Sequence, residues 1–538
     1  MNTAINQGAV LAEKLLRYAL HNGLIEEDDI IWARNQLLDL LRIDEPLQDA
    51  CIEDDPIPEY ASPILEEILD YCHEKGILSE NTLTHRDLLD TRIMGIFVSK
   101  PSDIISKFNR IKAADGITAA TDYFYHLCQK SDYIRMERIK RNLKWNYDSP
   151  FGTLEITVNL TKPEKDPKEI AALKNAPQSG YPKCLLCIEN VGYAGRINHP
   201  ARQTHRTIPL ELYGETWHFQ YSPYVYYNEH CIVLKEEHVP MKLTRETYHR
   251  LFAFLDQFPH YFIGSNADLP IVGGSILNHD HFQGGRYVFP MEKASVEYPL
   301  ECIEYENIEA AVVNWPMSVI RLASADKEAL GDYAFHILSM WREYSDPEHD
   351  ILAYSFDEAG NPIPHNTITP IARKKQDGRY ELDLVLRNNR TSSEHPLGIF
   401  HPHQDLHHIK KENIGLIEVM GLFILPGRLQ KELNAIKEYL TGNAAGSIYE
   451  LDDPAHPLHH HSQWVKELVI NYGTSLNETE AQSVLEEAVG KKCLRVLTDA
   501  GVFKTTDTGR EGFDRFLAAV GLTRRQLSGY SPLLESLK

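Results

Sequence analysis

Asp268–Gly285, DLPIVGGSILNHDHFQGG, is the most informative stretch of the 538-residue sequence. If the residues around His279, His281 and Gln283 are extended, the two-residue period of a strand places these three side chains on one face. Alternate strand residues lie roughly 6.6 Å apart. We therefore expect the two histidines to have different roles rather than to act on the same atom.

Paired glycines flank this segment, Gly273–Gly274 on one side and Gly284–Gly285 on the other. Glycine has no Cβ, so such pairs permit a ligand to approach the backbone closely, as phosphate sites require. A lone His-x-His motif is weak evidence of chemistry. The two glycine pairs and Gln283 make a functional site the favoured interpretation.

Outward from this stretch, the sequence pattern indicates an α+β protein. Between residues 183 and 426, β-branched and aromatic runs such as 230–234, 287–289 and 382–386 alternate with helical segments. This alternation predicts a core with a largely antiparallel sheet. Before and after the core, the apolar residues have helical spacing, which predicts helical regions at both ends of the chain.

We therefore expect four consecutive segments. They are an N-terminal helical region (1–112), a first core half (113–300), a second core half (301–426) and a C-terminal helical region (427–538). Each core half contains one His-x-His, so the core is interpreted as a duplication in which the two motifs occupy equivalent strands.

The charge balance excludes several classes of partner. Lys and Arg number 55 against 77 Asp and Glu, which gives a formal net charge of −22. Such a surface repels nucleic acids and anionic membranes. Any anionic ligand must therefore be held by a local basic pocket, and Arg196, Arg202 and Arg206 supply fixed positive charge for phosphate, although a solvated loop would have a similar composition.

The N-terminal segment and the cysteine content predict a cytoplasmic protein. Glu13 and Lys14 interrupt the apolar region that a signal peptide would need, and no apolar run reaches the ~18 residues of a membrane span. The chain has eight cysteines, only two of them closely spaced, which is not the pattern of a secreted disulfide framework.

Cys184 and Cys187 are the closely spaced pair, and the residues alone leave three interpretations open. A Cys-x-x-Cys can be a redox dithiol, a buried structural pair or half of a zinc site.

The stretch 268–285 resembles the active-site signature of type 2 galactose-1-phosphate uridylyltransferases (UTP–hexose-1-phosphate uridylyltransferases), members of the histidine triad superfamily. Asn278 departs from the small residue of that signature. Three further segments resemble the family, namely YPKCLLCIENVGYAGRINHPAR (181–202), HNTITPIARKKQDGRYELDLVLRNNRT (365–391) and GIFHPHQDLHHIKKENIGLIEVMGLFILPGRL (398–429).

The resemblance implies a duplicated histidine-triad-like core and an enzyme of galactose metabolism in the Leloir pathway. UMP would move between UDP-glucose and galactose 1-phosphate in two steps through a covalent uridylyl-histidine, with UDP-galactose as product. His281 would be the nucleophile, with its other ring nitrogen donating to a backbone carbonyl. Gln283 would donate to a phosphoryl oxygen. A homodimer is a further possibility.

The resemblance also implies positions for binding and for a metal. Uridine recognition would fall near Tyr221, Tyr224 and Asn266, although these aromatic residues could equally be core. In the second half, His401 and His403 resemble the paired histidines of a second metal site. The competing interpretation is that this region, with Lys410 and Lys411, contacts the sugar phosphate. A structural zinc would have four ligands, Cys184, Cys187, His238 and His279.

Two other function classes compete with this interpretation. A histidine triad phosphorylase or hydrolase of dinucleoside polyphosphates would share the covalent histidine and differ in the acceptor. A non-enzymatic zinc protein that binds RNA is disfavoured by the net charge of −22 and the absence of a basic stripe. The four histidines between His456 and His461 are expected to form a polar surface segment.

Overall fold

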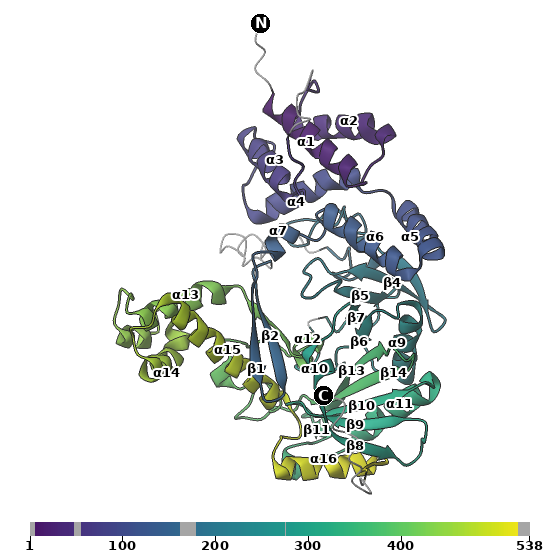
Figure 1. The fold of residues 1–538 in the computed structure, drawn as a ribbon, viewed down its shortest axis with the longest axis vertical. Helices are drawn as coiled ribbons and strands as arrows, with labels where there is room; N and C mark the ends of the chain where they lie inside the picture. Colours follow the sequence, from purple (N-terminus) through teal and green to yellow (C-terminus); the bar gives the residue numbers. More distant parts are fainter. Residues whose placement is uncertain (1–5, 48–54, 162–178, 275, 526–538) are drawn as a thin grey trace, which may run out of the picture. The chain divides into compact units, whose positions relative to one another are not determined.

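The computed structural model describes residues 6–47, 55–161, 179–274 and 276–525. Its contacts divide the chain into two compact units (Figure 1). The first contains residues 1–143, 159–240 and 278–286, and the second contains 144–158, 241–277 and 287–538. This division differs from the four consecutive segments expected, because the chain leaves the first unit after residue 240 and returns to it for residues 278–286.

The first unit begins with helices, as the apolar spacing predicts. They are α1 (Gln7–His21), α2 (Ile30–Leu41), α3 (Ser62–Glu74), α4 (Leu83–Met94), α5 (Pro101–Asp115), α6 (Ile117–Lys130) and α7 (Met136–Ile139), with 3-10 turns η1 (Glu27–Asp29), η2 (Gly95–Phe97) and η3 (Ile188–Asn190). Gly116, at φ +90°, separates α5 from α6. A residue with a side chain would be strained in that conformation.

An antiparallel sheet forms the second part of this unit, in the order β7-β5-β4-β3. Its strands are β3 (Ile208–Leu212), β4 (Glu215–Tyr221), β5 (Cys231–Lys235) and β7 (His281–Gly285). Helix α6 covers one face of the sheet, where Phe124 packs against Phe219 and Tyr221 at ring-centroid distances of 5.9 and 5.4 Å. Side chains on the opposite face point away from this aromatic core.

The second unit is built around seven antiparallel strands, in the order β6-β13-β14-β10-β9-β8-β16. Its strands are β6 (Phe262–Gly264), β8 (Val296–Cys302), β9 (Glu309–Val313), β10 (Val319–Ser324), β13 (Asn366–Lys374), β14 (Tyr380–Asn388) and β16 (Leu522–Arg524). The central pair β13 and β14 is in register from Asn366↔Asn388 to Lys374↔Tyr380. Two smaller sheets contain β1 (Leu143–Ser149), β2 (Gly152–Asn159) and β15 (Leu422–Pro426), and β11 (Tyr354–Phe356) and β12 (Pro362–Pro364).

Buried ion pairs occupy one face of these seven strands. The carboxylate of Asp383, fully buried on β14, accepts from Arg321 at 2.7 Å and from Arg373 at 2.9 Å. Two guanidinium groups compensate the buried carboxylate, so its pKa is lowered although burial alone would raise it.

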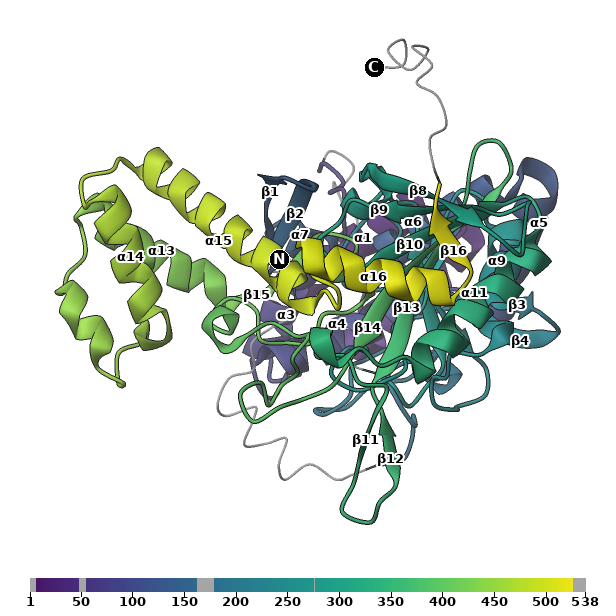
Figure 2. The same cartoon turned by 90° about the horizontal axis from the view of Figure 1, so that it is seen from below.

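Helices complete the second unit. They are α9 (Arg245–Gln257), α10 (Pro290–Lys293), α11 (Lys327–Glu343), α12 (Leu416–Val419), α13 (Arg428–Thr441), α14 (Ser462–Tyr472), α15 (Glu478–Ala500) and α16 (Asp507–Ala519), with 3-10 turns η4 (Pro347–His349), η5 (Gln404–Leu406), η6 (Ile448–Asp452) and η7 (His459–His461). Helix α13 packs against α14 and α15, which can be followed in Figure 2.

The α+β class, the largely antiparallel sheets and the helical regions at both ends are confirmed. The expected strand at 287–289 is wrong, since Phe289 precedes Pro290, the first residue of α10. The second His-x-His is also not on a strand, because His401–His403 lies in a loop before η5. None of the helices in the described ranges has the length and apolar character needed to cross a membrane.

Candidate active site and metal cluster

Strand β7 carries the central side chains of the candidate site. It pairs with β5 in the register Leu234↔His281 and Ile232↔Gln283. The intervening Phe282 stacks on Trp217 at a centroid distance of 4.8 Å, on the face that packs against the helices. Because strand side chains alternate, His281 and Gln283 lie together on the opposite face.

His281 has the hydrogen bonding of a nucleophilic imidazole. Its Nδ1 donates to the backbone carbonyl of His279 at 2.8 Å, and the side chain is buried. This bond places the ring proton on Nδ1, so Nε2 carries the lone pair. Burial lowers the pKa of His281 to about 4. In the part of the chain that the structure describes, no hydrogen bond engages Nε2, and the lowered pKa keeps the ring neutral at pH 7.

His230, the residue before β5, fixes the orientation of the Gln283 amide. Its Nε2 lies 3.2 Å from Gln283 Oε1, and its buried Nδ1 has no hydrogen-bond partner among the described residues. A proton on Nδ1 would leave a buried N–H without an acceptor, whereas a proton on Nε2 donates to Gln283. The favoured tautomer therefore binds Gln283 Oε1 and leaves the amide NH2 group available.

The surroundings of His230 keep its ring in place and uncharged. The ring stacks on Tyr226 at 5.4 Å and packs against Tyr227 at 4.5 Å, measured between centroids. Burial lowers the pKa of His230 to about 4. The sequence did not single out this residue, because its contact with Gln283 depends on the pairing of β5 with β7.

Cys184, Cys187, His238 and His279 come together in one cluster of possible metal ligands. The two sulfur atoms lie 3.4 Å apart. Cys184 Sγ is 3.2 Å from His279 Nδ1, and Cys187 Sγ is 3.0 Å from His238 Nδ1. Tetrahedral zinc with ordinary bond lengths separates such donors by about 3.5–3.8 Å. These donors would need to move apart by only a few tenths of an ångström to accommodate an ion.

Outer hydrogen bonds orient these ligands. His279 Nε2 donates to the carbonyl of Lys235 at 2.7 Å, which leaves Nδ1 to face the sulfur atoms. The Asn190 amide donates to the carbonyls of Cys184 and Cys187, each at 2.8 Å. Such outer partners are typical of metal sites, because they fix the tautomer and the direction of the ligand.

The protonation state of the cluster depends on whether a cation is bound. Without one, burial and the neighbouring Cys184 raise the pKa of the Cys187 thiol to about 12. A divalent ion would reverse this shift, since a coordinated cysteine is deprotonated. The four side chains thus form a compact Cys2His2 set that is able to hold a metal.

The structure separates the three arginines predicted to bind phosphate. Arg206 is buried and donates to the backbone carbonyls of Val98, Ser99, Gln203 and His205. Its guanidinium is engaged in holding the chain, so we leave Arg206 out of the site. Arg196 and Arg202 are partly exposed.

The two tyrosines predicted to contact uridine also have different environments. Tyr221 is fully buried on the helix-covered face, and its hydroxyl donates to the carbonyl of Thr121 at 3.1 Å. It is placed as a core residue, which was the alternative interpretation of these aromatics. Tyr224 is partly exposed and stacks on Tyr226, which in turn stacks on His230.

Asn266, in the second unit, is buried and accepts a hydrogen bond from the backbone N–H of Leu416 at 2.9 Å. A Cβ on Gly274 would lie 2.7 Å from the Asn266 amide nitrogen, and one on Gly273 would lie 2.5 Å from the carbonyl oxygen of Ala267. These glycines are thus required by the protein's own close packing, which the sequence argument had attributed to a ligand.

The histidines and lysines predicted as site residues in the second unit differ in exposure and in their partners. His401 is buried, and His403 donates to the carbonyl of Ile399 at 3.1 Å. Lys410 is buried in an ion pair with Glu418 at 2.8 Å, so its ammonium group is already neutralised. Lys411 is exposed.

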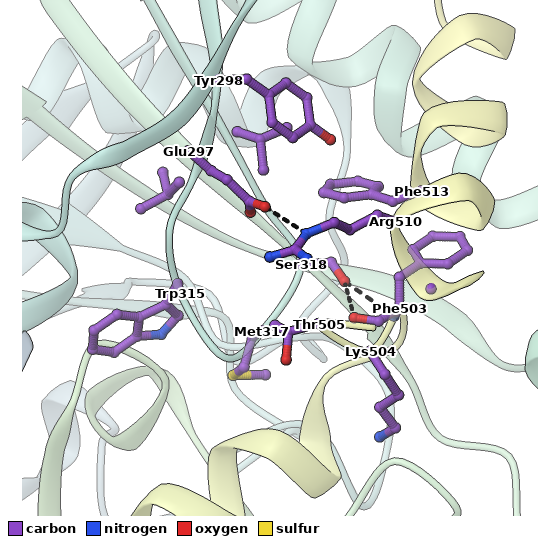
Figure 3. A pocket seen from close by; sticks show the side chains of 13 residues that line it. Glu297, Tyr298, Trp315, Met317, Ser318, Phe503, Lys504, Thr505, Arg510 and Phe513 are labelled. Atoms are coloured by element: carbon purple, nitrogen blue, oxygen red, sulfur yellow. Dashed lines mark hydrogen bonds and ion pairs between the residues drawn. The ribbon is translucent and has the colours of Figure 1, made fainter. Parts of the chain in front are cut away.

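A small cavity beside α16 is part of the packing of the second unit (Figure 3). Arg510 closes it with an ion pair to Glu297 at 2.6 Å, and Phe513 stacks on Phe503 at 5.4 Å. Its volume of about 20 Å³ is close to that of a single water molecule. It is too small to hold a nucleotide sugar.

Comparison with known proteins gives matches along nearly the whole chain. Residues 23–240 match the family model "Galactose-1-phosphate uridyl transferase, N-terminal domain", and residues 254–461 match the corresponding C-terminal domain. A galactose-1-phosphate uridylyltransferase of Caldanaerobacter subterraneus is 56% identical over 512 residues, covering 95% of this chain and 98% of that protein. Proteins of the same name from Fusobacterium nucleatum and Bacillus subtilis are 52% and 48% identical, each over 95% of this chain and over 98% and 97% of their own lengths.

Proposed function

The chain belongs to the galactose-1-phosphate uridylyltransferase family, and from this premise we propose that it moves UMP from UDP-glucose to galactose 1-phosphate through a covalent intermediate on His281. The observation that carries the proposal is the hydrogen bond from His281 Nδ1 to the carbonyl of His279 at 2.8 Å. It leaves the Nε2 lone pair on the face that also carries Gln283.

The first step forms one bond and breaks one bond. His281 Nε2 attacks the α-phosphorus of UDP-glucose, the P–N bond forms, and the bridging P–O bond breaks to release glucose 1-phosphate. The ring keeps its Nδ1 proton, and the carbonyl of His279 stabilises the positive charge that the ring acquires. In the second step a phosphate oxygen of galactose 1-phosphate attacks the same phosphorus, and the P–N bond breaks.

No strong general acid is needed for either step, because the leaving group and the incoming nucleophile are phosphate monoesters that are largely ionised at pH 7. The protein mainly has to stabilise the negative charge that develops on the phosphoryl oxygens. The amide NH2 group of Gln283 would donate a hydrogen bond to a phosphoryl oxygen, while His230 holds the amide oxygen in the opposite direction. A preorganised donor of this kind typically contributes a few kcal/mol.

Zinc is the metal that best suits the Cys184, Cys187, His238 and His279 cluster. The set offers two thiolates and two imidazoles at separations near those of a tetrahedral site. Four protein ligands leave no position for water or substrate, so the metal would be structural. It would hold the loop of Cys184 and Cys187 against the residues that immediately precede β7.

Substrate contacts are assigned more narrowly than the sequence suggested. In the first unit, Arg196, Arg202 and Tyr224 remain proposed contacts because each is at least partly accessible. In the second unit, Asn266, His401, His403 and Lys411 remain proposed positions for nucleotide or sugar-phosphate binding.

Isotope exchange tests the covalent mechanism. The enzyme is incubated with UDP-glucose and labelled glucose 1-phosphate, without galactose 1-phosphate. Label should enter UDP-glucose, because the first half-reaction is complete and reversible by itself. His281→Gly should abolish this exchange. A mechanism that requires both sugar phosphates at once would give no exchange with the wild-type enzyme and would refute the proposal.

A further inference from the structure

A second cluster of metal-ligating side chains lies in the C-terminal helices, where α13 meets the 3-10 turn η7. It consists of Glu432 on α13 and the neighbouring His460 and His461 on η7. The sequence indicated a polar surface segment here. His461 is instead only 1% exposed, whereas His460 remains accessible.

The possible ligand atoms of this cluster all lie within 4.8 Å of one another. His461 Nε2 lies 3.1 Å from one carboxylate oxygen of Glu432, and His460 Nε2 lies 3.3 Å from the other. An ion bound to imidazole and carboxylate at ordinary tetrahedral geometry separates its ligand atoms by about 3.4 Å. Each histidine nitrogen therefore already lies at nearly the required separation from a carboxylate oxygen.

His408 provides the outer partner that a metal-bound histidine requires. Its Nδ1 lies 2.6 Å from Nδ1 of His461, so one of the two nitrogens carries a proton and the other accepts it. When the proton is on His461 Nδ1, the lone pair of Nε2 points toward Glu432. Ligand histidines in proteins almost always donate their other ring N–H in this way.

Arg428 acts as the cation of the cluster in the metal-free protein. Its guanidinium donates to Glu432 at 2.5 Å and to His460 Nε2 at 3.4 Å. The side chain of Arg428 is 32% exposed, so it can move into solvent when another cation takes its place. Its third contact, to the carbonyl of His408 at 3.1 Å, does not involve any of the three proposed ligands.

We propose that Glu432, His460 and His461 bind one divalent first-row transition metal ion of the zinc class. Two imidazoles and a carboxylate suit such ions, and three protein ligands leave a position for water. Binding displaces the guanidinium of Arg428 and connects η7 to α13, while His408 orients His461. The site uses none of the side chains of the Cys2His2 cluster and does not depend on the proposed transferase activity.

Metal counting on full-length protein tests this proposal. Wild-type protein stripped with a chelator and titrated with Zn²⁺ should take up one ion more than Glu432→Gln. His460→Gln should lose the same ion, which provides a second variant should Glu432→Gln fold poorly. His459→Gln is the matched control, because His459 is an exposed neighbour whose ring contacts the carbonyl of Leu451; it should retain the ion.

Cobalt absorption distinguishes this ion from one bound by cysteine. Co²⁺ added to the double variant Cys184→Ser/Cys187→Ser should give a d–d spectrum without a thiolate charge-transfer band, and the added change Glu432→Gln should remove that spectrum. Arg428→Gln should bind the ion more tightly, since the competing cation is gone. Equal metal content and equal affinity in wild type, Glu432→Gln and His460→Gln would overturn the proposal.

Discussion

The contact between His230 and Gln283 gives a quantitative prediction about catalysis. His230→Phe keeps an aromatic ring between Tyr226 and Tyr227 and removes the N–H that binds Gln283 Oε1 at 3.2 Å. A hydrogen bond of this kind contributes about 0.5–1.5 kcal/mol. Without it the amide can turn its oxygen toward the phosphate, so we expect the first half-reaction to slow by about tenfold, since 1.4 kcal/mol corresponds to a factor of ten.

Gln283→Ala removes the donor itself, and loss of one such donor typically costs about 10²–10³ in rate. Because His230 acts only through Gln283, the double variant should react about as slowly as Gln283→Ala alone. The assay is a rapid-quench measurement of glucose 1-phosphate release in a single turnover, with substrate affinity measured separately.

His230→Gln is the control for this cycle, because its amide offers an N–H donor at a similar reach; it should recover part of the lost rate. The affinity for UDP-glucose should change little in any of these variants, since Gln283 acts mainly on the charge that develops during transfer. Fully additive effects of His230→Phe and Gln283→Ala on the rate would refute the positioning role.

Two further predictions concern stability. Cys187→Ser should lose the metal of the Cys2His2 cluster, and its unfolding temperature should be lower than that of the wild type. When both proteins are treated with a chelator, they should unfold at nearly the same temperature. Wild-type metal content in Cys187→Ser would contradict this. Because burial lowers the pKa of His230 from 6.5 to about 4, its contribution to stability is present above about pH 6.5 and is lost as the pH falls toward 4, since only the unfolded chain binds the proton. Between about pH 7.5 and 5 this loss of unfolding free energy is about 2 kcal/mol. In denaturant titrations over this range, the unfolding free energy of His230→Phe should therefore fall by about 2 kcal/mol less than that of the wild type. An identical pH dependence of the two proteins would exclude a neutral buried His230.

Local patterns in the sequence predicted much of the fold, because they depend on neighbouring residues. The helical spacing of apolar residues identified both terminal helical regions, and the runs 230–234 and 382–386 identified β5 and β14. The two-residue period around His281 correctly predicted that His281 and Gln283 share a face. The run 287–289 failed because its aromatic residues pack in a loop before Pro290.

The features that the sequence could not supply depend on contacts between distant residues. His230 meets Gln283 only through the register of β5 and β7. Tyr221 faces the helices because of its position along β4, and Lys410 is neutralised by Glu418 across a loop. The burial of His461 depends on its contacts with His408 and Trp464, so the sequence alone made this histidine-rich loop resemble an exposed segment.

The identity of the uridylylated residue tests the central claim most directly. Full-length enzyme is incubated with UDP-glucose, its intact mass is measured, and the modified peptide is mapped under conditions that preserve a phosphoramidate. We predict an added mass of one UMP per chain, located on His281 and absent from His281→Gly, which should still fold and bind UDP-glucose. No added mass in active enzyme, or UMP attached to another residue, would contradict the mechanism.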